Sequence, residues 1–169
     1  MSQTETTVIE FDSAETVTPW SAIDDRIMGG ASQSDPQYID GVGLRFCGVV
    51  SLENDGGFAS IRSEGMGCDL SKATGLRLKV RGDGRRYKFS LRTDSYFDGI
   101  SYQAEFDTDA DSWQEINLPF DAFIPTHHGL KLTTVAPMDC SHIESFGFFI
   151  ANKTAESFQL DIAWIRPLA

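Results

Sequence analysis

Apolar residues alternate with charged or polar residues in three segments in the middle of the chain. Between residues 76 and 81, Leu and Val alternate with Arg and Lys, and residues 87–92 and 102–107 show the same period of two. Successive side chains of a β-strand point to opposite faces of its sheet, so this period predicts strands with one buried and one solvated face. Such strands are typical of antiparallel sheets.

Other β-prone segments flank this section, and no long amphipathic helix interrupts them. We expect further strands at residues 8–11, 43–52, 57–62, 113–118, 145–150 and 157–165. About nine short strands at this spacing predict a β-sandwich or barrel. We expect an antiparallel β-sandwich of jelly-roll type, formed as one domain by residues 1–169 with residues 1–7 frayed. The residues predicted to lie in its core are Leu78, Val80, Phe89, Leu91, Phe148, Leu160 and Ile162.

Turn-forming residues predict how some of these strands are joined. Asp35-Pro36 predicts a tight turn between two short paired strands, and Glu53-Asn54-Asp55-Gly56 predicts a hairpin. Gly82-Asp83-Gly84 is expected to join a second hairpin. Residues 124–139 are expected to be irregular.

The charge of the chain limits its partners. The formal net charge of −11 repels phosphate at long range, which argues against general affinity for nucleic acid or anionic membranes. No run of about 18 apolar residues occurs, so no membrane span is expected.

The cysteines and the first residues of the sequence indicate the cellular compartment of the protein. Cys47, Cys68 and Cys140 are odd in number and far apart, which favours free thiols in a reducing compartment. The first ten residues have neither the basic and apolar regions of a secretory signal nor the Arg-rich composition of a transit peptide. We therefore predict a cytoplasmic protein.

Residues 20–34 contain the stretch around which the chain is organised. Gly29 and Gly30 permit positive φ angles or close approach of another backbone. Two interpretations stay open: a tight crossover whose aspartates bond nearby amides, or a ligand or partner site on the same backbone. The residues predicted to shape that site are Asp25, Met28, Gly29, Gly30 and Ser32, with support from Arg62.

Seven of the fourteen Lys and Arg residues fall within residues 77–92. If this segment is a hairpin, its basic residues line up as one stripe. Glu105 and Asp107 on the neighbouring strand are expected to neutralise the stripe, since opposite charges across strands stabilise one another. Otherwise the stripe receives an acidic partner surface or an anionic ligand, with Arg81 and Arg85 as contacts.

No catalytic residue is assigned, because no Gly-x-Ser-x-Gly elbow, Walker loop or dinucleotide fingerprint is present. Asp24 and Asp25 supply oxygen ligands of the kind that Ca²⁺ takes, but no calcium-loop motif surrounds them. The residues nearest to a zinc set lack the usual spacing; they are His127, His128, Cys140 and His142. We predict no enzyme activity, no metal and no cofactor.

Seven segments of the sequence occur in this order: Trp20, residues 25–32 with Met28-Gly29-Gly30 at the centre, and residues 57–62, 81–87, 118–120, 146–148 and 162–165. Together they span nearly the whole chain, and they resemble the complex I intermediate-associated protein 30 family.

This resemblance implies a galactose-binding-domain-like jelly roll. It also implies a non-enzymatic binding module that acts by protein–protein interaction, because the family's mitochondrial member assists assembly of respiratory complex I without catalysing a known reaction. The alternative is a carbohydrate or small-ligand binding module on the same fold, in which aromatic side chains stack on a sugar ring. The candidates for such stacking are Trp20, Tyr96, Phe97, Tyr102 and Trp113.

Overall fold

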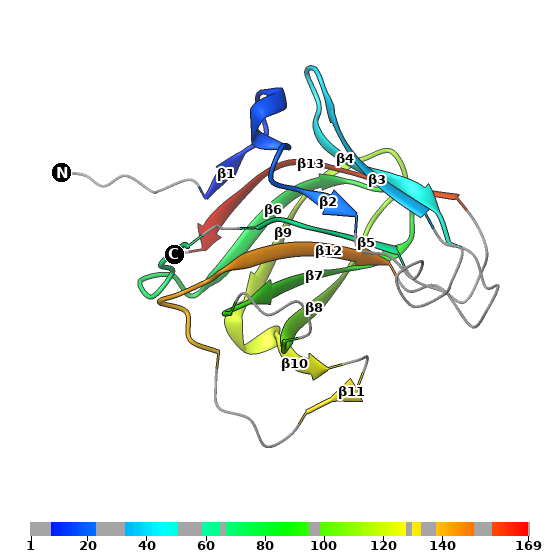
Figure 1. The fold of residues 1–169 in the computed structure, drawn as a ribbon. Helices are drawn as coiled ribbons and strands as arrows, with labels where there is room; N and C mark the ends of the chain where they lie inside the picture. Colours follow the sequence, from blue (N-terminus) through cyan, green and yellow to red (C-terminus); the bar gives the residue numbers. More distant parts are fainter. Residues whose placement is uncertain are drawn as a thin grey trace.

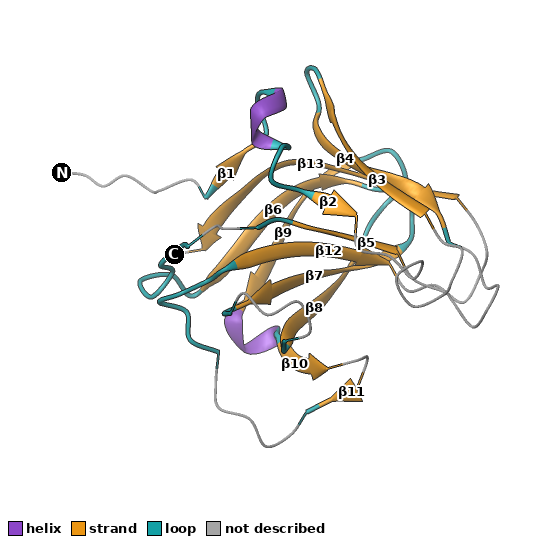
Figure 2. Ribbon diagram, viewed as in Figure 1, coloured by secondary structure: helices purple, strands orange, loops and turns teal. Residues whose placement is uncertain are grey.

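Two antiparallel sheets pack face to face in the protein (Figures 1 and 2). The computed structural model describes residues 8–22, 33–50, 59–64, 67–94, 99–127, 130–132, 138–150 and 157–168. Sheet A contains, in spatial order, β3 (Gln33–Ile39), β4 (Gly43–Val49), β13 (Ser157–Leu168), β6 (Gly75–Arg81) and β9 (Trp113–Pro119), with β1 (Ile9–Glu10) beside β13. Sheet B contains β11 (Leu130–Lys131), β10 (Ile124–His127), β8 (Ser101–Asp107), β7 (Arg86–Arg92), β12 (Ser145–Ile150), β5 (Ala59–Arg62) and β2 (Ser21–Ala22).

Helical structure in the described residues is limited to short 3₁₀ turns. These are η1 (Ala14–Thr16) and η4 (Phe120–Ala122). The predicted antiparallel β-sandwich is therefore confirmed.

The core lies between the sheets and is rich in aromatic rings. All seven side chains predicted for it are completely buried. Phe89 packs against Phe146 and Phe148, with ring centroids 5.7 and 5.0 Å apart, and Trp20 stacks on Phe148 at 5.8 Å. Full burial of one such apolar side chain contributes roughly 1.5–3 kcal/mol to folding.

Both predicted hairpins are wrong. β4 lies in sheet A and β5 in sheet B, and the same holds for β6 and β7. A crossover between sheets and a hairpin use the same turn residues and bury the same alternate side chains, so the local pattern does not separate them. Other strands take the neighbouring positions: β6 lies between β13 and β9, and β7 lies between β8 and β12.

The predicted turn at Asp35-Pro36 is also wrong, because β3 runs straight through it and pairs with β4 along its whole length. β3 is the edge strand of sheet A, where a residue without a backbone N–H is tolerated. The chain turns later, where the amide of Val42 donates to the carbonyl of Ile39 at 2.9 Å.

Residues 124–139 are not irregular throughout. β10 pairs with β8, and β11 pairs with β10, so this segment extends the edge of sheet B. Together with η4 it forms one wall of a surface hollow.

Candidate functional site

The structure separates the residues that the sequence predicts to form a site. Asp25, Met28, Gly29, Gly30 and Ser32 lie outside the described residues. Arg62 lies on the outer face of sheet B, and Arg81 lies on the outer face of sheet A. Arg85 lies at the corner where the chain passes from one sheet to the other.

The same separation divides the predicted basic stripe. Cations of β6 and cations of β7 point away from the sandwich on opposite sides, because the two strands belong to different sheets. The expected neutralisation across strands is present on β7, where Arg86 Nε lies 2.7 Å from Asp107 Oδ1 and Arg86 Nη1 lies 3.4 Å from Glu105 Oε1. These exposed pairs contribute little to stability.

A row of residues with two small members, Gly147 and Ser90, crosses the middle of the outer face of sheet B. In this row, Arg62 lies opposite Gly147, Gly147 lies opposite Ser90, and Ser90 lies opposite Gln103. A Cβ atom at Gly147 would come within 2.6 Å of Ser90 Oγ, so the missing side chain lets the hydroxyl lie across the strand. We call the outward side chains of β5, β12, β7 and β8 the sheet B face.

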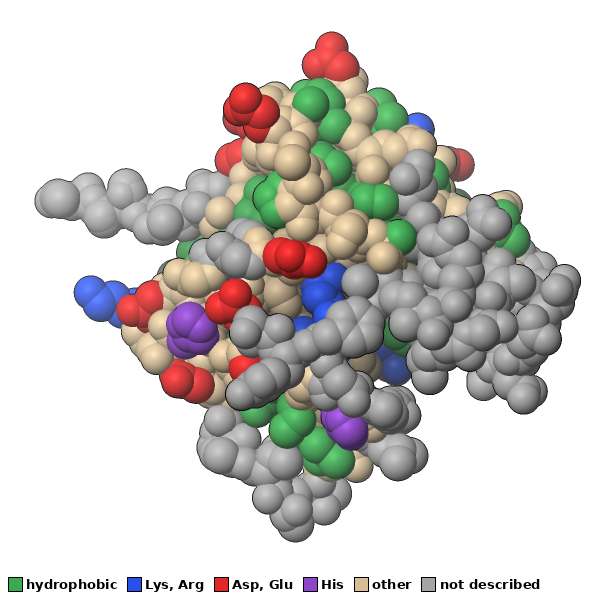
Figure 3. Space-filling view, viewed as in Figure 1, with side chains coloured by type: hydrophobic (Ala, Val, Ile, Leu, Met, Phe, Trp, Pro, Cys, Tyr) green, Lys and Arg blue, Asp and Glu red, His purple; other side chains and the backbone are tan. Residues whose placement is uncertain are grey.

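Two arginines stand close together on the sheet B face. Burial, and then the charge of Arg92, lower the pKa of Arg62 to about 10. Arg92 Nη1 donates to the carbonyl of Gly99 at 3.0 Å. The charge of Glu64 acts in the opposite direction and raises this pKa, so Arg62 remains charged at neutral pH; groups with shifted pKa values cluster at functional sites. In Figure 3, Lys and Arg atoms lie near the middle of the view, over β12 and β7.

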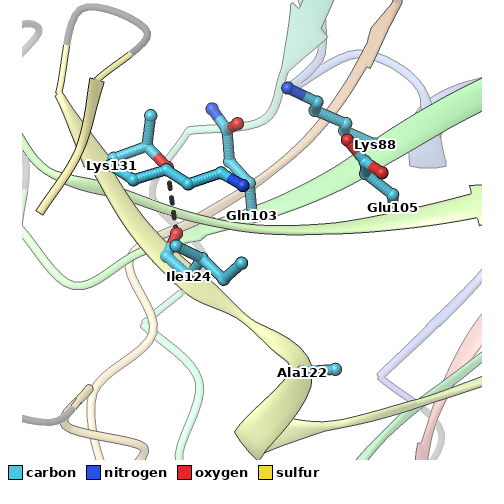
Figure 4. A pocket seen from close by; sticks show the side chains of 7 residues that line it. Lys88, Gln103, Glu105, Ala122, Ile124 and Lys131 are labelled. Atoms are coloured by element: carbon cyan, nitrogen blue, oxygen red, sulfur yellow. Dashed lines mark hydrogen bonds between the residues drawn. The ribbon is translucent and has the colours of Figure 1, made fainter.

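A hollow lies at the β10 edge of the sheet B face. It encloses ≈ 230 Å³ and is lined by Lys88, Gln103, Glu105, Ala122, Ile124, Thr126 and Lys131. Figure 4 shows Lys88 beside Glu105 on one side, with Lys131 reaching toward Gln103 on the other. The dashed line marks the hydrogen bond from Thr126 Oγ1 to the carbonyl of Ile124, at 3.0 Å. The lining offers hydrogen-bond donors and acceptors and two exposed apolar side chains, Ala122 and Ile124.

The described aromatic residues proposed for sugar stacking do not line this hollow. Trp20 lies in the core, where it stacks on Phe148, and Tyr102 points inward with 8% of its surface exposed. Trp113 lies on the outer face of sheet A. Tyr96 and Phe97 lie outside the described residues.

Hydrogen bonds hold the corner between β6 and β7. The Asp83 carboxylate accepts from the Tyr87 hydroxyl at 3.0 Å and from the amide of Gln159 at 2.9 Å. Burial, and then the charge of Asp83, raise the pKa of Tyr87, so its hydroxyl stays a donor. Arg85 also contacts Asp83, with Nε 3.7 Å from Oδ2. These contacts give the corner a structural role, and a partner contact by Arg85 stays a prediction.

Metal chemistry has little support in the part of the chain that the structure describes. No three His, Cys, Asp or Glu side chains there lie close enough together to hold an ion. His142 Nε2 lies 3.1 Å from Glu144 Oε1. Asp24, Asp25, Asp55 and His128 lie outside that part. None of the described helices is long and apolar enough to span a membrane.

Comparison with known proteins identifies the family. The family model described as "Complex I intermediate-associated protein 30 (CIA30)" matches residues 9–162. The chain belongs to this family. The resemblance inferred from seven segments is therefore confirmed.

Two relatives carry the family's name. The mouse (Mus musculus) mitochondrial complex I intermediate-associated protein 30 is 26% identical over 94% of this chain. Its counterpart from Drosophila melanogaster is also 26% identical over 94% of the chain. The chain spans 54% of the mouse protein and 61% of the fly protein, so a part of each relative has no counterpart here.

Solved structures with the same fold are carbohydrate-binding modules and domains of larger enzymes. The family 11 module of a cellulosomal cellulase from Clostridium thermocellum superposes with a TM-score of 0.69 at 17% identity, covering 100% of this chain and 97% of that chain. The same module in complex with a β-1,3-1,4-mixed-linked tetrasaccharide gives 0.69 at 18% identity, covering 98% and 95%. An agarase matches 99% of this chain over 25% of its own length, with a TM-score of 0.66 and 10% identity. These likenesses confirm the galactose-binding-domain-like jelly roll.

The prediction of a cytoplasmic protein is wrong, because the mouse and fly relatives are named as mitochondrial proteins. Free thiols do not distinguish one reducing compartment from another. Targeting signals are addresses read by receptors, so the composition of a folded domain does not reveal them.

Proposed function

We propose that this chain is a non-enzymatic binding module that docks a protein partner during assembly of a larger complex. The names of its relatives support an assembly intermediate of complex I as this partner. The fold supports a binding role, because its structural neighbours include modules that bind a ligand on a sandwich of this kind.

The pair of arginines on the sheet B face is the observation that carries this proposal. Arg62 keeps its charge although burial and the charge of Arg92 disfavour it, and two small residues, Gly147 and then Ser90, follow it across the same face. Arginine is enriched at protein interfaces, and its planar head recognises carboxylates with two parallel hydrogen bonds.

The proposed contacts keep the set that the sequence suggests. They are Asp25, Met28, Gly29, Gly30, Ser32 and Arg62, together with Arg81 and Arg85 near the crossover.

Affinity capture from the native extract tests the proposal. The tagged wild-type chain is expected to retain proteins of a complex I intermediate, identified by mass spectrometry. The Arg62→Gln variant and the Asp25→Asn, Arg62→Gln double variant are expected to lose them while their melting temperatures stay within a few degrees. Lys72→Glu changes an exposed lysine in the turn before β6, outside the sheet B face, and serves as the control. If the double variant is stable and still retains all of these partner proteins, the sheet B face is not the docking surface.

Carbohydrate binding is the second candidate, favoured by the polar hollow and by the neighbour that holds a tetrasaccharide. Calorimetric titration with that tetrasaccharide separates the two functions. Saturable binding that Gln103→Ala abolishes would favour the sugar. The leading proposal predicts no saturable binding, and substrate turnover by the purified chain would contradict both candidates.

A further inference from the structure

A row of four side chains crosses the outer face of sheet A. Arg45 of β4 lies opposite Asp161 of β13, Asp161 lies opposite Arg81 of β6, and Arg81 lies opposite Trp113 of β9. Figure 1 shows these four strands side by side. We call the outward side chains of these strands, with Glu10 of β1, the sheet A face.

Asp161 is completely buried although it points outward, because the two arginines close over it. Arg45 Nε donates to Asp161 Oδ1 at 2.8 Å, and Arg81 Nη2 donates to Oδ2 at 2.9 Å. One carboxylate offsets one of the two positive charges, so the cluster stays cationic. Charge-assisted hydrogen bonds hold both guanidinium groups in place. Less side-chain conformational entropy is therefore lost when a partner docks.

The fourth member of the row adds an apolar surface. Trp113 has 37% of its surface exposed. The Arg81 guanidinium lies 4.8 Å from the centroid of its ring, and Lys79 Nζ lies 5.9 Å from it. Among the described residues, Lys79 has no ion-pair partner. Trp and Arg dominate the energetic hot spots of protein interfaces.

The face as a whole has more cations than acids. Among the outward side chains that the structure describes, five cations face three acids: Arg45, Arg77, Lys79, Arg81 and Arg166 against Glu10, Glu115 and Asp161. Glu115 lies opposite Lys79 and pairs with Arg77 at 3.9 Å, and Glu10 pairs with Arg166 at 2.9 Å, so the described side chains of this face keep an excess of two positive charges. This local positive charge belongs to a chain whose formal net charge is −11.

We propose that the sheet A face docks an acidic segment of the protein partner, with carboxylates against Lys79 and Arg81 and an apolar side chain on Trp113. This inference rests on the proposed function, since it names the chemistry of the partner. Complementary charge steers association and sets specificity, and a cationic face suits an acidic segment. A second copy of this chain is disfavoured, because a symmetric dimer through this face would place the same cationic groups against one another.

The test is an NMR titration of the full chain with oligo-glutamate, followed through its tryptophan indole signals. The Trp113 signal is expected to shift saturably, the signal of buried Trp20 to stay unchanged, and added salt to weaken the effect. Lys79→Glu should weaken the affinity roughly tenfold, while Lys72→Glu should leave it unchanged. An absent shift, an equal response to oligo-lysine or equal affinity in Lys79→Glu would overturn the inference.

The capture experiment separates this inference from the proposed function. If wild type and Lys79→Glu retain a partner equally, the inference is wrong and the proposed function stands. If wild type retains none, the proposed function fails and the peptide titration alone decides the inference. If sedimentation shows that wild type is a dimer and that Lys79→Glu is a monomer, the face binds a second copy of the chain and the proposal is wrong.

Discussion

Arg81 and Asp161 lie directly opposite each other on β6 and β13, with Arg81 Nη2 2.9 Å from Asp161 Oδ2. Arg45 reaches the same carboxylate from β4 on the other side. Side chains therefore join three strands of sheet A in addition to the backbone ladder. The same contact holds cationic groups on the outer surface, so fold stability and the proposed docking chemistry depend on one carboxylate.

Replacing Asp161 with Asn should lower the free energy of unfolding by on the order of 2 kcal/mol, because two guanidinium groups lose their counter-charge. The arginines remain partly exposed, at 24% and 30%, and solvent screening keeps the loss below that of a fully buried ion pair. Urea unfolding at neutral pH measures it. Asp121→Asn, at an exposed position of η4, is the matched control and should change stability by less than about 0.5 kcal/mol. Equal losses in both variants would show that the buried carboxylate has no special role.

Truncation of Phe148 to Ala should cost roughly 3–5 kcal/mol, because the ring packs between Trp20 and Phe89 in the core. Val49→Ala, where half of the side chain is exposed, should cost less than about 1 kcal/mol. Denaturant midpoints compare the two. A loss below about 1 kcal/mol in Phe148→Ala would contradict the packing described here.

The core was predictable from the sequence because each strand is locally amphipathic. Leu78, Val80 and Leu91 alternate with charged or polar residues, and sheet geometry sends every second side chain inward. The period does not reveal which strands are neighbours. β6 and β7 are joined by a short turn, yet they lie in different sheets.

The row on the sheet A face was not predictable for the same reason. Alternation in Leu160-Asp161-Ile162 places Asp161 outward, but its partners lie 116 and 80 residues away in the chain, at Arg45 and Arg81. Only the register of β4, β13 and β6 brings them together. The sequence predicts Arg62 as a site residue. It does not predict that Arg62 lies near Arg92, because that depends on the position of β12 between β5 and β7.

Tyr87→Phe should destabilise the protein by about 1–2 kcal/mol, because the Asp83 carboxylate loses a donor at the corner between the sheets. Tyr102→Phe is the control, since no acceptor for its hydroxyl is found among the described residues, and it should change stability by less than about 0.5 kcal/mol. Thermal unfolding of both variants checks this. A Tyr87→Phe protein as stable as wild type would mean that the corner does not depend on this bond.

Three surface carboxylates should titrate below the ordinary Asp value of about 3.9. Hydrogen bonds from Ser71 lower the pKa of Asp69, those from Ser141 lower the pKa of Asp139, and the Arg86 contact lowers the pKa of Asp107.

Since these folded-state pKa values are depressed, the stability that they contribute is present above the unfolded pKa. It is lost as the pH falls through the folded values, at and below about pH 4. NMR titration of the carboxyl carbons measures each group. Ser141→Ala should raise the pKa of Asp139 and leave that of Asp107 unchanged; an ordinary Asp139 value in wild type would contradict the assignment.

Native gel electrophoresis of extracts from cells that carry the tagged chain tests the central claim most directly. If the chain is an assembly module, it should migrate with a complex I intermediate and be absent from the finished complex, and its deletion should make that intermediate disappear or accumulate. Arg62→Gln should shift the chain to its free position, while Lys72→Glu should not. A chain that migrates only as the free protein, in cells whose intermediates are unchanged by its deletion, would contradict the account.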